Sequence, residues 1–570
     1  MKVSDYIVRF FIEREISDVF GYPGGMVTHL MDSFDKYSSE IAAHVNYHEQ
    51  GAAFAACGYA QASLRPGVAY ATSGPGATNL ITGIANAYFD SIPVIFITGQ
   101  VNTYEGKGEL PLRQKGFQEM DVVSLAATIT KYCVQITKAE DIRYHLEKAY
   151  HIAIDGRPGP VLLDIPMDVQ RAEIEPSELQ GFTATRSRGN VSVNEVSEEI
   201  YAALKRAQRP CILVGAGVRA SGMHYSFEEW VARLQIPVVT SMLAVDVLPD
   251  YLYNYKFVGA YGVRYANFIL AKSDLIIALG SRMDLRQTGA NTDNFAVDAK
   301  IIRIDIDSSE FSRKIKNGEK DFCIDIKELL PFLADNGYVK IPDFTDWINV
   351  CEQIKTMLKN KDELEPNQIM KELSELIDKD TIITTDVGQN QVWVAQSFAP
   401  KGQRILFSGG HGAMGYSIPA AIGAHYAEGR KVVAVTGDGG LQMNIQELQF
   451  IVRENLPIVI VLLNNASLGM IRHFQEMYFS KNYVQTKKEG GYTVPNFGAL
   501  AAAYKIPYFS IDDRSNLGNL QSLFESDGPV FIEIFLHGDT YVYPKLAMGK
   551  MNQDQEPSLD REIYEYLLKL

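Results

Sequence analysis

Apolar runs that alternate with helix-length stretches dominate this chain. The same order recurs three times: a glycine-rich turn, a stretch long enough for a helix, and then a proline-led apolar strand. Continuous runs of Val, Ile and Leu that alternate with helices are typical of parallel sheets covered on both faces. The pattern therefore predicts three βαβ units, which lie at 73–99, 214–236 and 436–465.

Two polar stretches, at 171–190 and 335–347, lie between these units and are predicted to be linkers. The chain has 570 residues, more than one hydrophobic core supports. We expect an α/β protein of three doubly wound parallel-sheet domains, at 1–170, 190–335 and 365–550, followed by a C-terminal tail at 551–570. In such sheets ligands bind at the carboxyl ends of the strands, beside the glycine turns.

One predicted helix carries a carboxylate in an unusual place. In YHEQGAAFAACGYAQ, at 47–61, small and apolar residues lie on every face, which is the pattern of a helix buried on most sides. Glu49 nevertheless stands at its start. The positive end of the helix dipole can stabilise such a carboxylate by up to about 1 kcal/mol. A catalytic role is the alternative, and the helix alone does not decide between them.

Two polar residues follow neighbouring strands of the third unit. VVAVTGDGG ends in a tight turn with Asp438, and the next strand ends in LLNNASLG with Asn465. A carboxylate and an amide at adjacent strand ends can share Mg²⁺, which usually keeps a ligand phosphate in its remaining positions. The turn from Gly437 to Gly440 is then expected to receive a diphosphate with its metal. An ordinary turn followed by an Asn cap is the alternative, and the strand–turn–helix–strand context favours the site.

Composition narrows the choice of partners. Hydrophobic residues make up 46% of the chain and charged residues 22%, close to average soluble globular usage. The net charge of −15 argues against a nucleic-acid partner, which would need a basic face. A phosphorylated ligand must therefore be held by local groups.

The cysteines and the N-terminus suggest the compartment. The five cysteines contain no C-x-x-C pair and read as reduced core thiols. No apolar run is long enough to span a membrane, and the first residues mix charges where a signal peptide needs an unbroken apolar region. We expect a cytoplasmic protein with no membrane partner.

Several motifs, in a fixed order, resemble those of the thiamine-diphosphate (ThDP) enzymes, and specifically of the acetolactate (acetohydroxyacid) synthase family. The resemblance covers nearly the whole chain and implies a first domain that binds the aminopyrimidine, a middle domain that commonly carries FAD, and a third domain that binds the diphosphate. The motifs are GYPGG at Gly21, HEQGA at His48, TSGPGATN at Thr72, DSIPVIFITGQV at Asp90, GFQE at Gly116, GRPGPVLLDIP at Gly156, TTDVGQNQ at Thr384, GGHGAMGYSIPAAIGA at Gly409, and GDGG…NN.

The resemblance assigns roles to individual positions. Glu49 would bond the aminopyrimidine N1′ and promote the tautomer that takes the proton from thiazolium C2. Asp438, Asn465 and the main-chain carbonyl of Ser467 would bind the metal, and Met414 would hold the cofactor in its bent shape. The catalytic set also includes Phe117, Gln118 and Gly25. The other ThDP-binding positions are Pro23, Thr72, Asn79, Gly388, Gln389, Asn390, Gly412, Gly437, Gly439, Gly440, Leu468, Gly469 and Met470.

For the middle domain the resemblance implies FAD. CILVGAGVRA fits a strand followed by G-x-G-x-x-A, which is a weak fingerprint alone. The flavin residues would be Gly215, Gly217, Thr240, Gly280, Arg282, Arg286 and Asp305. A salt-bridged surface turn is the alternative for the charged ones. Pyruvate decarboxylases share the fold without flavin, and an oxalyl-CoA decarboxylase-like middle domain holds ADP. In the family the two halves of a site come from two subunits, so we expect a homodimer or homotetramer.

Three departures from the family pattern fall where an acceptor substrate would sit. Phe474 replaces the usual Trp, Ala260 stands where a Met would intrude, and the loop QVNTYEGKGELPLRQKGFQE is longer and gains Lys107, Arg113 and Lys115. The changes at Phe474 and Ala260 remove volume from the wall of the acceptor site. The loop adds cations, and Arg and Lys are the residues that usually donate hydrogen bonds to a phosphate. An acceptor larger than pyruvate is indicated, such as the keto-deoxysugar nucleotide used by a smaller set of synthase-like enzymes. Solvated loop charges are the alternative.

The sequence thus predicts a ThDP-dependent carboligase that decarboxylates pyruvate and transfers the two-carbon unit to a carbonyl acceptor. The alternatives are an ordinary acetolactate synthase of branched-chain amino-acid synthesis, or a pyruvate oxidase. A non-enzymatic binding homologue is disfavoured, because it needs no proton-transferring Glu49 beside Asp438 and Asn465.

Overall fold

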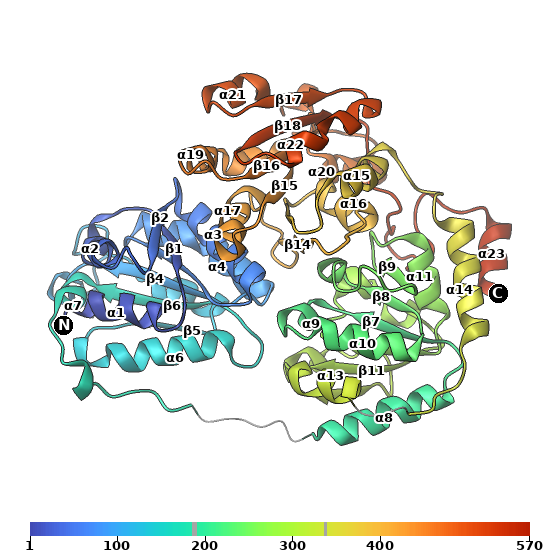
Figure 1. Cartoon of the computed structure of the whole chain (residues 1–570), viewed down its shortest axis with the longest axis horizontal. Helices are drawn as coiled ribbons and strands as arrows, with labels where there is room; N and C mark the ends of the chain where they lie inside the picture. The colour runs from blue at the N-terminus through green and yellow to red at the C-terminus, as the bar shows by residue number, and fades with distance from the viewer. Residues whose placement is uncertain (185–190, 336–338) are drawn as a thin grey trace.

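Three parallel sheets, one after another along the chain, form the frame of the protein (Figure 1). The computed structural model describes residues 1–184, 191–335 and 339–570. Each sheet has six strands, and every pair of neighbouring strands is parallel. The predicted α/β class is therefore confirmed. Each sheet also falls inside one of the three predicted domain ranges, whose boundaries stay predictions.

The first sheet has the strand order β2-β1-β3-β4-β6-β5. Its central strands β3, β4 and β6 are buried at every position, because helices cover both faces, whereas the edge strands β2 and β5 are partly exposed. The strands are β1 (Asp18–Gly21), β2 (Ala42–Val45), β3 (Gly67–Ala71), β4 (Val94–Gln100), β5 (Tyr132–Gln135) and β6 (Val161–Pro166). The helices are α1 (Val3–Ile12), α2 (Thr28–Lys36), α3 (Glu49–Ser63), α4 (Pro75–Phe89), α5 (Val122–Ala126), α6 (Ile142–Ile154) and α7 (Met167–Arg171).

The middle sheet has the order β12-β11-β10-β7-β8-β9. Its strands are β7 (Pro210–Val214), β8 (Val238–Thr240), β9 (Asn254–Phe257), β10 (Leu275–Leu279), β11 (Lys300–Asp305) and β12 (Lys320–Cys323). Its helices are α8 (Val193–Arg206), α9 (Ala216–Ala220), α10 (His224–Leu234), α11 (Arg264–Lys272), α12 (Leu285–Thr288) and α13 (Ile326–Asp335).

The third sheet has the order β14-β13-β15-β16-β18-β17. Its strands are β13 (Ile382–Thr385), β14 (Arg404–Leu406), β15 (Val432–Gly437), β16 (Ile458–Asn464), β17 (Tyr508–Ile511) and β18 (Val530–Phe535). Its helices are α15 (Glu365–Leu376), α16 (Gln389–Ser397), α17 (Ser417–Glu428), α18 (Asp438–Met443), α19 (Leu448–Arg453), α20 (Gly469–Tyr478), α21 (Phe497–Ala503) and α22 (Gln521–Phe524).

The first and third domains share one core, centred on the contact of α3 with α17 (Figure 1). Both helices are small-residue helices, and their backbones approach closely. A Cβ at Gly423 would lie 1.8 Å from the carbonyl oxygen of Ala55, and one at Gly58 would lie 2.2 Å from that of Ala420. Glycine is therefore required at both positions, and α3 is held rigidly against the third domain.

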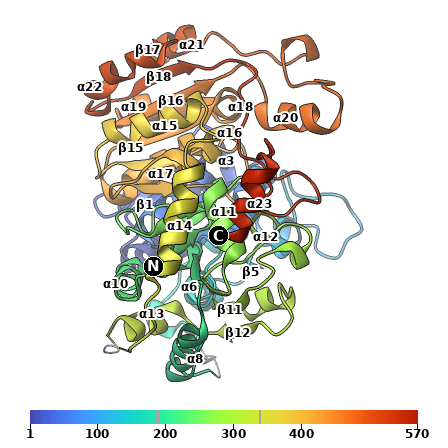
Figure 2. The same cartoon turned by 90° about the vertical axis from the view of Figure 1, so that its right-hand side faces the viewer.

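The second predicted linker is partly wrong. Trp347 does not lie in an open connection, because it belongs to α14 (Thr345–Leu358) and is buried in a core of the middle domain. Its indole N–H donates to the carbonyl of Pro210 at 3.0 Å. Of the first predicted linker, residues 185–190 lie outside the described part of the chain. The helix α14 runs beside α11, as Figure 2 shows.

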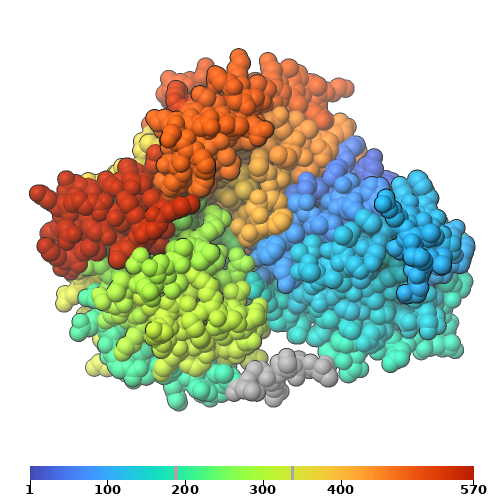
Figure 3. All heavy atoms as spheres, turned by 180° about the vertical axis from the view of Figure 1, so that it is seen from behind, coloured from blue at the N-terminus to red at the C-terminus, as the bar shows by residue number. Residues whose placement is uncertain are grey.

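The C-terminal segment returns to the middle domain. Its helix α23 (Arg561–Lys569) packs on α11, and Figure 3 shows the segment covering that side of the molecule. The buried Arg264 fixes it by donating to the carbonyls of Gln555 and Pro557, both at 2.9 Å, while pairing with Asp362 at 2.7 Å. No helix in the described ranges is long and apolar enough to cross a membrane.

Candidate active site

The carboxyl of Glu49 lies inside the protein at the first residue of α3. It is 7% exposed, and its Oε2 accepts a hydrogen bond from the Asn79 amide at 2.9 Å. Its Oε1 lies against Gly76, where an added Cβ would approach it to 3.1 Å. The helix start explains the position of the carboxyl, but a single amide partner leaves one oxygen for a ligand. Nearby, the Met26 N–H donates to the Thr72 hydroxyl at 3.2 Å and fixes the turn with Pro23 and Gly25.

A second carboxyl, which the sequence reasoning missed, supports the start of α3. Glu447 is fully buried and accepts from the Asn46 amide at 2.9 Å and from the Tyr47 N–H at 3.0 Å. Burial raises the pKa of Glu447 to about 7, although these bonds oppose the shift. The signal in the sequence was an acidic residue between apolar ones in NIQELQF. Glu447 belongs to the third domain, so that domain holds the segment that precedes Glu49.

The structure brings the predicted metal ligands together where β15 and β16 end. These strands pair with Gly437 opposite Leu463, so the residues that follow them meet. The Asn465 N–H donates to Asp438 Oδ2 at 3.1 Å. Asp438 is 2% exposed, and burial raises the pKa of its carboxyl to about 6. The Tyr492 hydroxyl, which no sequence motif indicated, donates to Asp438 Oδ1 at 2.5 Å.

The donor set at this edge suits a hard cation. It offers one carboxylate, the Asn465 amide and the main-chain carbonyl of the buried Ser467, all of them oxygen ligands of the type that Mg²⁺ prefers. Within the described residues there is no cluster of three or more His, Cys, Asp or Glu that could hold a metal. The predicted set is not of that kind, since most Mg²⁺ positions would be filled by phosphate and water.

Residues from four turns form a cradle beside this edge. Gly388, with a φ of +134°, precedes α16, and the Gln389 carbonyl oxygen Oε1 accepts from the Asn465 amide at 2.9 Å. The backbone passes close to side chains here, as the contacts of an added Cβ show. At Gly469 a Cβ would lie 1.8 Å from Gln389, and at Gly440 it would lie 2.5 Å from Asp386. At Gly439 it would lie 2.8 Å from Leu468 and 3.1 Å from Met414. The glycines leave backbone N–H groups uncovered beside the N-terminus of α16, and such a helix N-terminus can bind an anion. Asn390 lies between two of these turns, because its Oδ1 would be 3.0 Å from a Cβ at Gly388 and 3.3 Å from one at Gly437. Gly412 and Met470 complete this part of the predicted set; Gly412 has a φ of +71°, and the side chain of Met470 packs at the edge of the third-domain core.

The long loop of the first domain is organised by Glu119, whose carboxylate accepts N–H groups of Lys107, Lys115 and Gly116. The Lys115 ammonium binds the carbonyls of Tyr104 and Gly106, at 2.9 and 3.2 Å, within the same loop. That contact weakens the expectation of a free loop cation. Arg113 is exposed.

Phe117 of this loop is 79% exposed, which leaves a large ring on the surface. The neighbouring Gln118 has a φ of +62°, and its backbone lies against Gly74.

The two predicted acceptor residues lie in other domains. Phe474 lies on α20, is 37% exposed, and contacts Tyr478 with 4.8 Å between ring centres. Ala260 donates its N–H to the Arg286 carbonyl at 2.7 Å.

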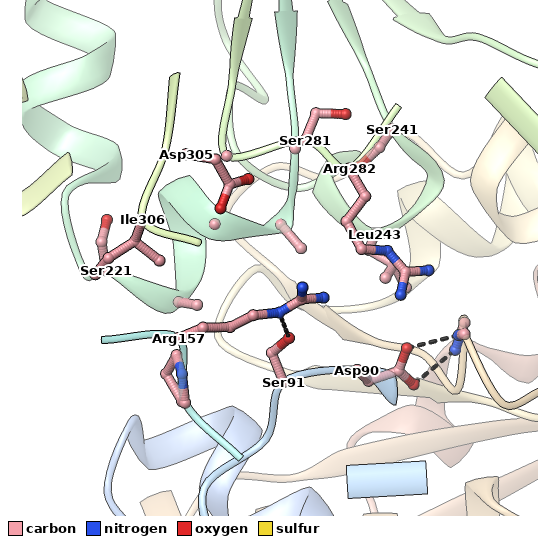
Figure 4. Close-up of a pocket in the computed structure, with 18 of the residues that line it drawn as sticks. Asp90, Ser91, Arg157, Ser221, Ser241, Leu243, Ser281, Arg282, Asp305 and Ile306 are labelled. Atoms are coloured by element: carbon pink, nitrogen blue, oxygen red, sulfur yellow. Dashed lines mark hydrogen bonds between the residues drawn. The ribbon is translucent and has the colours of Figure 1, made fainter. Parts of the chain in front are cut away.

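A cavity of about 390 Å³ lies where the three domains meet (Figure 4). Arg157 of the first domain and Arg282 of the middle domain both reach into it. The Arg157 guanidinium donates to Ser91 at 2.8 Å, and Asp90 accepts the N–H groups of Gly409 and Gly410 at 2.9 and 2.6 Å. The predicted flavin residues that line the cavity are Gly215, Gly217, Gly280, Arg282, Arg286 and Asp305.

Thr240 lies buried in β8, and its neighbour Ser241 lines the cavity instead. Burial raises the pKa of the Asp305 carboxyl. Sequence reasoning assigned no role to Asp90, Ser91 or Arg157, although the motifs at Asp90 and Gly156 contain them. Their contribution depends on the meeting of separate domains.

Three parallel-sheet domains of α/β class, with a buried carboxyl in the first and an Asp that accepts an Asn N–H in the third, define the class of protein to which this chain belongs. The chain matches three family models of the thiamine pyrophosphate (thiamine diphosphate) enzymes. The N-terminal TPP binding domain matches residues 1–125, the central domain matches 197–333, and the C-terminal TPP binding domain matches 386–534.

Curated relatives extend the match to nearly the whole chain. It is 36% identical over 561 residues to the acetolactate synthase large subunit of Lactococcus lactis subsp. lactis, covering 96% of this chain and 94% of that protein. It is 35% identical over 567 residues to the acetolactate synthase isozyme 2 large subunit of Escherichia coli, covering 97% and 99%. The corresponding values for the large subunit of Corynebacterium glutamicum are 37% over 574 residues, covering 97% and 90%. The chain belongs to the thiamine pyrophosphate enzyme family and is an acetolactate synthase-like carboligase.

Proposed function

We propose that this carboligase decarboxylates pyruvate and transfers the two-carbon unit to a second carbonyl compound, with ThDP and Mg²⁺ as cofactors. The observation that carries the proposal is the edge of the third sheet. There the buried Asp438 accepts the Asn465 N–H, and Asn465 in turn donates to Gln389. ThDP, when bound, supplies the carbanion chemistry that amino-acid side chains lack.

The residues of the chain divide the work between the two ends of the cofactor. Asp438, Asn465 and the Ser467 carbonyl would hold Mg²⁺, while the backbone and side chains from Gly388 to Asn390 would bind the diphosphate. At the other end, Glu49 would hold a proton on its Oε1, because the Asn79 amide already occupies Oε2 and fixes the orientation of the carboxyl.

We propose FAD as the ligand of the cavity between the three domains. The glycine turns at Gly215 and Gly280 leave bare backbone, and Asp305 offers a carboxylate. Arg157 and Arg282 place guanidinium groups in the lining, although Arg157 pairs with Asp307 at 3.1 Å and Arg282 with Asp284 at 3.4 Å. An ADP-containing ligand would use the same groups. The absorption spectrum of the purified protein, before and after acid release of the ligand, separates the two, since only a flavin absorbs in the visible range.

For the acceptor we propose a carbonyl compound larger than pyruvate, such as a keto-deoxysugar nucleotide. The small Ala260 and the half-exposed Phe474 support it, whereas the loop lysines support it less, because Lys115 binds loop carbonyls. Ordinary acetolactate synthase is the second candidate, favoured by the names of the relatives.

Product analysis by mass spectrometry tests these proposals together. The holoenzyme receives pyruvate alone, pyruvate with a simple aldehyde, or pyruvate with a keto-sugar nucleotide. A cross-product that exceeds acetolactate supports the larger acceptor, and acetolactate as the main product in every mixture assigns the ordinary synthase. Oxygen consumption that matches pyruvate loss would instead identify a pyruvate oxidase, and no loss of pyruvate would refute the carboligase.

We also propose a cytoplasmic homodimer or homotetramer with active sites at the subunit interface. Glu49 bonds within the first domain and Asp438 bonds within the third, so each half-site has its own partners. The exposed Phe117 ring beside Gln118 supports an interface at the long loop. The five cysteines, all of them free, support the location.

A further inference from the structure

Lys545 is a buried lysine beside the two residues of the predicted acceptor wall. The residue is 5% exposed, and its main chain bonds that of Glu556 in both directions, at 2.9 and 2.7 Å. The next N–H, of Leu546, donates to the Ala260 carbonyl at 2.7 Å. The backbone is therefore fixed on both sides, and it holds the side chain at this wall.

The ammonium of Lys545 has no oxygen partner among the described residues. It lies 5.9 Å from the ring centre of Tyr261 and 5.8 Å from that of Phe474. Burial lowers the pKa of this lysine to about 8, and no carboxylate opposes that shift. Aromatic faces attract a cation, but they replace little of the hydration that the ammonium of a largely buried lysine loses.

The acidic side chains nearby have other partners. Glu556 accepts from the Lys550 ammonium at 2.8 Å, and Glu476 accepts from Lys481 at 3.1 Å. His473 is buried and stacked on Tyr541, and burial lowers its pKa to about 3, so this imidazole is neutral. The surroundings thus contain an ammonium with no counter-charge, which a ligand can supply.

The approach of Lys545 to Phe474 of α20 indicates which ligand its ammonium would bind. Gly469, at the start of α20, packs against Gln389 of the predicted diphosphate cradle. Phe474 lies five positions further on, about 7.5 Å along the helix axis. Lys545 is therefore separated from the predicted diphosphate cradle. Its ammonium lies instead beside Phe474 and beside Tyr261, which follows Ala260.

We propose that Lys545 binds an anionic group, a carboxylate or a phosphate, of the acceptor substrate. The ammonium would bind this group away from the reacting carbonyl and so select charged acceptors over neutral ones. This proposal rests on the proposed carboligase function and on the acceptor wall of Ala260 and Phe474.

Two matched pairs of aldehydes test it in the holoenzyme with pyruvate as donor. Succinic semialdehyde against pentanal probes a carboxylate, and glyceraldehyde 3-phosphate against glyceraldehyde probes a phosphate. Lys545→Met should raise the KM of at least one charged aldehyde by about 10-fold or more and leave its neutral analogue within about 2-fold. Lys545→Arg should keep the preference. Lys550→Met is the control, because Lys550 lies in the same segment but already pairs with Glu556.

Release of CO₂ from pyruvate, with ferricyanide as oxidant, reports the donor half of the reaction without any acceptor. No CO₂ from the wild type would defeat the proposed function itself. Normal CO₂ release, with no wild-type preference for either charged aldehyde or with equal KM values in Lys545→Met, would overturn only the role of Lys545. A loss of kcat for both members of each pair, together with a lower melting temperature, would show a structural lysine and also overturn it. If Lys545→Met does not fold, Lys545→Gln replaces it.

Discussion

Glu49 is a carboxyl with one amide partner at the start of an otherwise small and apolar helix. At the scale of single residues the sequence predicted this helix start, because apolar residues on every face made one charged residue conspicuous. It did not predict Asn79 as the partner of Oε2 from spacing, since Asn79 lies on another helix. Tyr492 and Glu447 were missed for the same physical reason: their roles depend on contacts between distant segments.

Replacing Glu49 with Gln removes the exchangeable proton and keeps the shape of the side chain. We expect ThDP to remain bound and turnover of pyruvate to fall by at least about 100-fold, the lower range for a lost acid–base group. Cofactor binding is checked by the rise in melting temperature on addition of ThDP and Mg²⁺. Turnover close to that of the wild type would remove Glu49 from the catalytic set.

Glu447 should make stability depend on pH. Its pKa is about 7 in the folded protein, above the ordinary value of 4.5, because of burial. The folded state therefore keeps this proton to a higher pH than the unfolded state does. The stabilising contribution is complete below about 4.5 and is lost as the pH rises through about 7.

Comparison with Glu447→Gln isolates this group, because all other carboxyls are shared. The melting temperature of the wild type minus that of the variant should fall between pH 5 and pH 8. A difference that stays constant over this range would show that Glu447 does not titrate there. Its pairing with Asn46 and Tyr47 would then be that of a carboxylate throughout this range.

At the scale of elements, the alternation of apolar runs and glycine turns was enough to predict the βαβ units. The central strands, such as β3, β4 and β6, are buried on both faces, so their composition reflects their position directly. The failure at Trp347 has a simple cause: the polar residues around it suggested a connection, but one indole that donates to Pro210 anchors α14 to the middle domain. The many polar residues of α14 lie on its exposed face, and the few apolar residues of its buried face were not enough to indicate a helix.

The close contact between α3 and α17 can be tested with one methyl group. In a solvent-exposed helix, replacing Gly with Ala stabilises the folded protein by about 1 kcal/mol. At Gly423, however, the new Cβ would lie 1.8 Å from the Ala55 carbonyl oxygen. We expect Gly423→Ala to lower the melting temperature and, because α3 carries Glu49, to lower activity. Gly518→Ala is the matched control, since nothing lies within 4 Å of its added Cβ. Equal melting temperatures for the two variants would contradict the contact.

At the scale of the whole molecule, prediction from sequence depends on how many domains build a site. The metal edge comes from two neighbouring strands of one sheet, and the sequence located it through Asp438 and Asn465. The cavity at Arg157 joins three domains, and the sequence pointed to it only through residues of the middle domain, by a glycine fingerprint and by resemblance at Arg282, Arg286 and Asp305. Nothing in local spacing states that Asp90 of the first domain binds Gly409 of the third.

The proposed sharing of active sites between subunits gives the last prediction. Glu49→Gln loses the proton-holding group, and Asp438→Ala loses the metal, so each homodimer is inactive alone. If one subunit supplies Glu49 and its partner supplies Asp438, a mixed dimer contains one intact site and one site with both changes. Co-expression at equal levels makes half of the dimers mixed, so about a quarter of wild-type activity should return.

The control for this experiment is co-expression of two differently tagged Glu49→Gln chains, which should stay inactive. Asp438→Ala must also lose the rise in melting temperature on addition of ThDP and Mg²⁺, because the diphosphate binds through the cation. Purification through both tags isolates the mixed dimer, whose activity should be about half that of the wild type since one of its two sites is intact. An inactive mixed dimer would place Glu49 and Asp438 of the same chain in one site, and the contact of α3 with the third domain would then be part of that site rather than its support.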